Sequence, residues 1–160
     1  MQSIVDVRAP KRAAGKGART AKQDSKQDLR SWLDALRAAG EVREVSGAKR
    51  ESEIGGIVDL HMRKMGNPAV LFDDIPGYAR GYRILANILT SVRRINLTLG
   101  LPLDGSPIEL VSYWRKYMKE ARSIAPVTVK SGPLLDNVSS GKDENIQSIP
   151  TPRWHEHDGG

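Results

Sequence analysis

The residues best suited to chemistry in this chain lie together near its C-terminus. His155 and His157 are followed by Asp158, and imidazole and carboxylate groups are common ligands of transition metals. In an extended strand, residues two apart point to the same side, so the two histidines could converge on one ion. No third protein ligand lies near the segment, however, and we therefore assign no metal site to it.

Three other groups of polar residues could take part in chemistry, and each also has a purely structural interpretation. His61 could be a base, but its neighbours offer no partner, so we expect a partly buried, hydrogen-bonded histidine. Asp73 and Asp74 could bind a metal or form an acid–base pair, but they precede a Pro-Gly turn, so we expect turn residues. Arg93 and Arg94 could hold an anion near a helix start, but we expect a solvated helix face. We assign no catalytic, cofactor-binding or metal-ligating residue.

Composition excludes several classes of function. The chain of 160 residues has no cysteine, which excludes disulfides, thiolate metal sites and cysteine nucleophiles. It has no run of apolar residues long enough for a transmembrane helix and no apolar N-terminal segment typical of a secretion signal. We therefore expect a cytoplasmic protein without membrane contact.

The net charge of +6 is unevenly distributed. Residues 1–27 hold seven basic and two acidic residues, so the rest of the chain is nearly neutral. This stretch has no hydrophobic period, and we expect a disordered basic tail. Such a tail could bind nucleic acid, but we favour this function least of the three considered in this section. No aromatic side chain is interleaved with the charges, and residues 28–160 are nearly neutral.

Helix signals occur at four places. An apolar stripe predicts a helix that starts near Ser25 or Asp28 and stops at Gly40. A second helix is predicted after a cap at Ser52, with Gly55 and Gly56 indicating close packing. A short helix from Thr90 or Ser91 to Gly100 follows. The last begins with the capping box Ser106-Pro107-Ile108-Glu109.

Strands are expected over residues 41–46, 68–72, 82–88 and 126–130. The apolar stripes predict one core that contains residues from three helices: Trp32, Leu33, Leu36, Ile57, Val58 and Trp114. The buried face of the last helix is predicted to comprise Ile108, Val111, Trp114 (or Leu110) and Tyr117. The fold class is α/β (α+β), with helices on a small mixed sheet. We expect an α/β domain over residues 28–125 and, over residues 126–160, a strand and an extended, abnormally exposed arm.

Short motifs in a fixed order give the chain a resemblance to a known family. From residue 28 to residue 160, it resembles the N-terminal portion of the UbiD family of decarboxylases. The matching stretches are Asp28-Leu29-Arg30-Ser31-Trp32-Leu33, Ser52-Glu53-Ile54, Pro68-Ala69-Val70-Leu71-Phe72 with its Ile75-Pro76-Gly77 turn, Asn87-Ile88-Leu89-Thr90-Ser91-Val92-Arg93-Arg94, Leu99-Gly100, Gly132-Pro133, Asp136-Asn137-Val138 and Ile149-Pro150-Thr151-Pro152-Arg153-Trp154-His155 leading to Asp158-Gly159-Gly160.

The resemblance implies a carboxy-lyase that interconverts aromatic or α,β-unsaturated carboxylic acids and their decarboxylated products. It implies prenylated FMN with a divalent metal, manganese, and possibly potassium in the complete enzyme. The family's flavin-binding split barrel and catalytic residues follow the Asp-Gly-Gly motif, so none is transferred to this chain.

The function expected from the resemblance is that of the N-terminal segment of such a decarboxylase, inactive alone. Its partner would be the remainder of the enzyme, in the same chain or a separate one, within a homo-oligomer. The alternative is a non-catalytic subunit or assembly module of a split decarboxylase.

Overall fold

The computed structural model describes residues 28–64, 66–138, 140–143 and 145–158. The predicted disordered tail, residues 1–27, lies outside the described residues. A mixed three-stranded sheet forms the centre of the fold, with strands β1 (Val42–Ser46), β2 (Ala69–Asp73) and β3 (Ile84–Ala86) in that spatial order. β1 pairs parallel with β2, and β2 pairs antiparallel with β3. The α+β class with a small mixed sheet is therefore confirmed.

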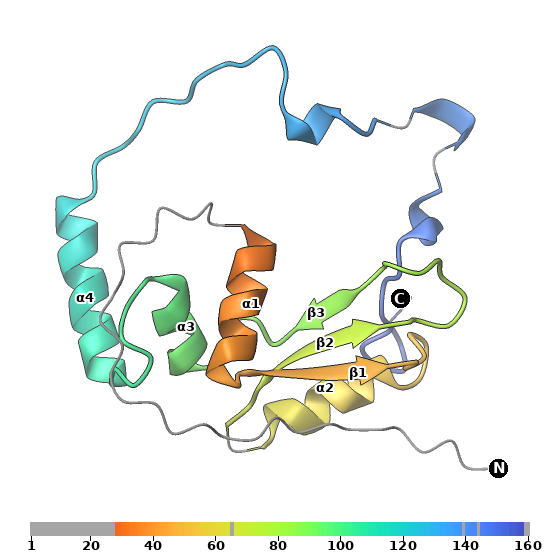
Figure 1. Cartoon of the computed structure of the whole chain (residues 1–160), viewed down its shortest axis with the longest axis horizontal. Coiled ribbons are helices and arrows are strands. Elements are labelled where there is room, and N and C mark those ends of the chain that lie inside the picture. The colour runs from red at the N-terminus through yellow and green to blue at the C-terminus, as the bar shows by residue number, and fades with distance from the viewer. Residues whose placement is uncertain (1–27, 65, 139, 144, 159–160) are drawn as a thin grey trace.

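Helices cover both faces of the sheet (Figure 1). Helix α2 (Ile54–Met62) connects the two parallel strands and packs on one face, while α1 (Leu29–Ala39) and α3 (Val92–Thr98) pack on the other. Successive residues of a strand point to opposite faces. Val70 and Phe72 accordingly join the α2 side, and Ala69 and Leu71 join the α1 side. This two-sided burial explains why β2 is a continuous apolar run.

The helix ends follow the predicted caps in three cases out of four. The Asp28 carboxylate accepts from the Ser31 N–H at 2.8 Å, and α1 ends at Gly40 with a left-handed φ of 71°. Ser91 caps α3, and Ser106 and Glu109 form the capping box of α4 (Pro107–Glu120). The cap predicted at Ser52 is wrong. Helix α2 begins after Glu53, which makes no side-chain capping bond.

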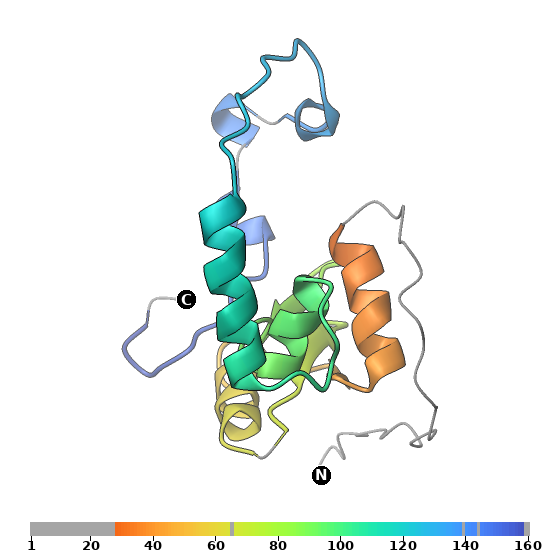
Figure 2. The ribbon, with the colours of Figure 1, turned by 90° about the vertical axis from the view of Figure 1, so that its left-hand side faces the viewer.

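The predicted single core is wrong because the sheet divides it. Trp32, Leu33 and Leu36 pack on one face, whereas Ile57 and Val58 pack on the other. Trp114 belongs to neither cluster. It is 47% exposed on α4, which adjoins α3 at the outside of the fold (Figure 2).

The buried face predicted for α4 is also wrong. The helix contains no buried residue, and its four predicted core residues are all exposed: Ile108, Val111, Trp114 and Tyr117. Its half-buried residues include Leu110, the alternative to Trp114, and Tyr113. The apolar stripe exists in the sequence, but within the described residues nothing covers it.

Residues 121–149 form a long connection that leaves α4, arches away from the sheet and returns to the opposite side of the fold (Figure 1). The strand predicted at residues 126–130 is absent, because this segment pairs with no other strand in the described structure. Three short 3₁₀ turns occur instead, at Pro133–Leu135, Gly141–Asp143 and Ile146–Ser148. Where burial is described, the residues of the connection are exposed apart from half-buried Gly132, which agrees with the exposed arm expected from residue 126. The prediction fails at Pro150 and Pro152, which are buried.

Two strand ends differ from the predicted ones. The strand expected at residues 82–88 is confined to Ile84–Ala86, and β2 extends to Asp73. Asn87 follows β3 with a positive φ of 57°, which turns the chain out of the sheet. None of the helices in the described residues has the length and apolar content needed to span a bilayer.

Candidate functional site

The most deeply buried charged side chain belongs to Arg94 on α3. Its guanidinium is fully enclosed, and it donates through Nε to the carbonyl oxygens of Asn87 and Ile88 at 3.0 and 3.1 Å. Its Nη2 donates to the Thr90 hydroxyl at 2.8 Å. These acceptors lie in the turn between β3 and α3, so Arg94 holds that turn against its own helix.

Glu41 neutralises the arginine pair from the opposite side. Its carboxylate lies 3.2 Å from Nη1 of Arg94 and 2.7 Å from Nε of Arg93. Burial lowers the pKa of Arg94, and the nearby Glu41 carboxylate opposes that shift. The hydrogen bond to Glu41 raises the pKa of Arg93. Both arginines therefore stay charged at neutral pH.

The expected solvated face at Arg93 and Arg94 is thus wrong for Arg94. Arg93 is partly exposed and also pairs with Asp104, whereas Arg94 is inaccessible. Sequence reasoning missed the partner Glu41, which is far along the chain. The residues next to Arg94 in the sequence do not indicate that a distant carboxylate pairs with it. The donors of Arg94 bind backbone and carboxylate oxygens, so this arrangement stabilises the fold and offers no free anion site.

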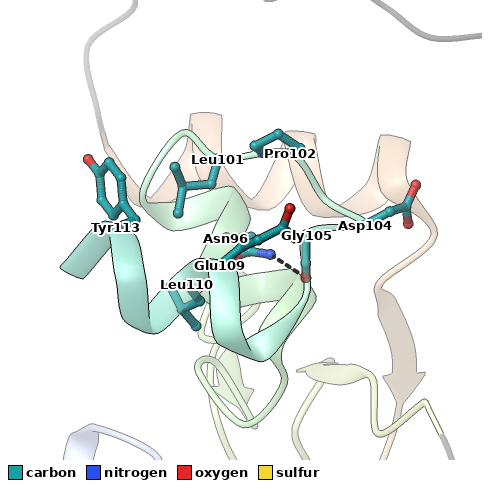
Figure 3. A pocket seen from close by; sticks show the side chains of 8 residues that line it. All are labelled: Asn96, Leu101, Pro102, Asp104, Gly105, Glu109, Leu110 and Tyr113. Carbon is teal, nitrogen blue, oxygen red and sulfur yellow. Dashed lines mark hydrogen bonds between the residues drawn. The ribbon is translucent and has the colours of Figure 1, made fainter. Parts of the chain in front are cut away.

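A hollow of about 330 Å³ lies between α3 and α4 (Figure 3). Its buried side chain is Asn96, whose Nδ2 donates to the Gly105 carbonyl at 3.0 Å. Oδ1 of Asn96 has no hydrogen-bond partner among the described residues. The charged groups of the hollow are the carboxylates of Asp104 and Glu109, and these already bind Arg93 and the Ser106 N–H. Two carboxylates without a lining cation do not suit an anionic ligand.

A second, more polar hollow of about 290 Å³ lies where the end of the chain crosses the start of α2. Its lining combines Arg153 and His155 with the carboxylates of Glu51 and Glu156. The Arg153 guanidinium donates through Nη2 to the carbonyl oxygen of Glu156 within its own turn.

His155, His157 and Asp158 lie in a turn, and the strand geometry that would align the two histidines is absent. The Asp158 carboxylate accepts from the Trp154 N–H at 3.0 Å, and the Asp158 N–H donates to the His155 carbonyl at 3.1 Å. Both histidines are exposed. Among the described residues, no group of three histidine or acidic side chains is arranged to hold a metal ion.

The two remaining candidates are His61 and the pair Asp73 and Asp74. His61 is half-buried, and its Nδ1 lies 2.8 Å from the Ile57 carbonyl oxygen one turn earlier, which confirms the predicted hydrogen-bonded histidine. Asp73 ends β2, and its buried Oδ1 has no partner in the described part of the chain. Asp74 takes a left-handed φ of 49°, which is turn geometry, as expected.

Comparison with known proteins gives this fold a family context. The family model described as 3-octaprenyl-4-hydroxybenzoate carboxy-lyase N-terminal domain matches residues 33–114. A pyrrole-2-carboxylic acid decarboxylase of Pseudomonas aeruginosa is 32% identical over 141 residues, which cover 83% of this chain and 28% of that protein.

Solved structures of vanillic acid decarboxylase (ShVdcCD) from Sedimentibacter hydroxybenzoicus share the fold. The open form with a truncated ShVdcD superposes with a TM-score of 0.75 at 27% identity, and the closed form with 0.74 at 28% identity. Each match covers 86% of this chain but only 30% and 29% of the other chain. The chain therefore spans under a third of the length of these relatives.

Proposed function

The chain belongs to the UbiD family, as a 3-octaprenyl-4-hydroxybenzoate carboxy-lyase N-terminal domain, and on that premise we propose that it is the N-terminal part of a non-oxidative decarboxylase. The proposal is supported by one observation: both the sequence and the fold of this chain align along their length with decarboxylases of the family that are about three times longer. We further propose that the complete enzyme acts on an aromatic or α,β-unsaturated carboxylic acid.

Prenylated FMN with a divalent metal is the cofactor that this family implies, and the described residues do not fit it. A flavin phosphate requires cations or converging N–H donors. The larger hollow carries only carboxylates as charged groups. The other sets Arg153 and His155 beside the carboxylates of Glu51 and Glu156, which oppose the binding of an anionic phosphate. We therefore propose that cofactor and metal bind elsewhere in the complete enzyme.

The role left for this domain is structural: it carries and orients the part that does the chemistry. The sheet and its helices supply a rigid body, with two apolar clusters and the enclosed Arg94–Glu41 pair. The apolar face of α4 and the apolar side chains of the connection remain exposed: among them are Val111, Trp114 and Leu134. Apolar side chains exposed along one helix face are typical of an interface. We retain the division into residues 28–125 and 126–160 as a proposal.

A chimera tests the proposed function. Residues 28–158 would replace the matching stretch of the P. aeruginosa pyrrole-2-carboxylic acid decarboxylase, and carbon dioxide release from pyrrole-2-carboxylate would be measured. We expect turnover well above that of a variant from which the stretch is deleted. A folded chimera that is no more active than the deletion variant would refute the proposal.

The second candidate is a separate subunit of a split decarboxylase. The vanillic acid decarboxylase structures favour this candidate, because their name, ShVdcCD, includes a distinct component, ShVdcD. Mass spectrometry of the protein purified from its own cells separates the two. A mass near 17.6 kDa together with a co-purifying larger chain supports the split enzyme. A single chain of about three times that mass supports the first candidate.

A further inference from the structure

We propose that residues 150–154 form an intramolecular latch, which docks on the N-terminal end of α2 and fixes the direction in which the chain continues. Two hydrogen bonds join the latch to the loop before α2. The Arg153 N–H donates to the Arg50 carbonyl at 3.0 Å, and Nη1 of Arg50 donates to the Thr151 carbonyl at 2.9 Å. Pro150 and Pro152 of the latch are buried as well.

Gly55 permits the close approach of the latch. A Cβ at this position would lie 2.7 Å from the Arg153 carbonyl oxygen and 2.8 Å from that of Trp154. These are backbone atoms, which cannot rotate away as the end of a flexible side chain can. Glycine disfavours a helix interior relative to alanine, so its presence in the first turn of α2 is explained by this contact. Gly56 is different, because a Cβ there meets no described atom within 4 Å.

The latch is not held in place by a short tether. The connection over residues 121–149 is long and exposed, and closing a loop of this length costs conformational entropy. Docking must therefore come from the contacts of the latch itself. A long connection also allows the latch of one copy to dock on α2 of another, as in domain swapping. The structure shows the contact within one chain, and we commit to that arrangement.

The latch has a consequence that rests on the proposed function. In the relatives, the matched region makes up only 28% and 30% of the protein, so most of each relative lies outside it. A latch would set where the remainder of the enzyme lies relative to the sheet, although the long, exposed connection precedes it. Gly55 is then a positioning residue for the decarboxylase, and it touches no substrate.

Amide hydrogen exchange tests the latch in the chain itself, without any assay of activity. In the Gly55→Ala variant, we expect the protection of the Arg153 amide to fall by about tenfold or more, because the added methyl group displaces the latch. The matched control is Gly56→Ala, which adds the same methyl group to the next residue of the same helix. It should leave Arg153 as protected as in the unchanged chain. Equal protection of Arg153 in both variants would overturn the proposal.

A second variant keeps the test decisive if Gly55→Ala does not fold. Arg50→Ala removes the side-chain bond to the Thr151 carbonyl and should lower Arg153 protection while circular dichroism stays unchanged. Unchanged protection would count against the latch.

Light scattering over a range of concentrations shows whether the latch contact forms within one chain or between two chains. A dimer that Gly55→Ala converts to a monomer would overturn the intramolecular arrangement. A failed chimera would leave these results untouched, since they concern this chain alone.

Discussion

At the scale of single residues, the enclosed Arg94 accounts for much of the local order around α3. One side chain satisfies the carbonyls of Asn87 and Ile88, the Thr90 hydroxyl and the Glu41 carboxylate. Arg37 offers a contrast, because its pairs with Asp34 and Glu44 lie at the surface. Exposed pairs contribute little to stability, whereas removing one partner of a buried pair leaves uncompensated polar groups.

We expect Arg94→Met to lower the free energy of unfolding by about 3 kcal/mol or more, because buried acceptors lose their donor. The control, Arg37→Met, should cost less than about 1 kcal/mol. Urea unfolding followed by circular dichroism measures both. Similar costs for the two variants would contradict the structural role assigned to Arg94.

Leu33 and Trp114 differ in how far they are buried, although the sequence pattern predicts both in one core. Leu33 is 5% exposed between α1 and the sheet, so Leu33→Ala should cost roughly 2–5 kcal/mol. Trp114 is 47% exposed on α4, and Trp114→Ala in this chain should cost less than about 1 kcal/mol. Thermal and urea unfolding give both values. A cost for Trp114→Ala as large as that for Leu33→Ala would mean that another surface covers α4.

At the scale of elements, local signals were reliable where the chain itself provides the partner. The capping box of α4 and the Gly40 stop of α1 depend on residues a few positions apart, and both occur as predicted. The strand predicted at residues 126–130 required a neighbouring strand, and the described residues provide none. Likewise, an apolar stripe predicts that a helix face needs a partner, but not that the partner belongs to this chain. For that reason α4 was misplaced in the core.

The capping box gives α4 a pH dependence. Hydrogen bonds from Ser106 lower the pKa of Glu109, so the ionised form is favoured in the folded helix. A lowered pKa stabilises the helix above the unfolded-state pKa, and this contribution is lost as pH falls through the folded-state pKa. We expect the helicity of α4 to decrease between about pH 5 and pH 3.

The matched variant for this effect is Glu109→Gln. Glutamine keeps an acceptor for the Ser106 N–H but cannot ionise. The variant should show a weaker decrease in helicity over that range, measured by circular dichroism or by the amide chemical shifts of α4. An identical pH profile in the unchanged chain and the variant would show that Glu109 does not contribute.

At the scale of the whole molecule, sequence motifs indicated the family more clearly than they indicated a site. The motifs follow one another in order along the chain, whereas the residues considered as chemical groups take part in turns, ion pairs and local hydrogen bonds. Arg94 required a partner from another element, which residue spacing does not reveal. The histidines required a strand and a third ligand, and in the structure they lie in an exposed turn.

We propose that this domain supports the catalytic part of a decarboxylase and performs none of the chemistry itself. The most direct test is a titration of the purified chain with prenylated FMN in the presence of Mn²⁺, followed by the absorbance and fluorescence of the flavin. We predict no saturable change, because one described hollow has no lining cation and the other sets Arg153 and His155 beside two carboxylates. Saturable binding of one cofactor per chain would contradict the account and would place a cofactor site within these 160 residues.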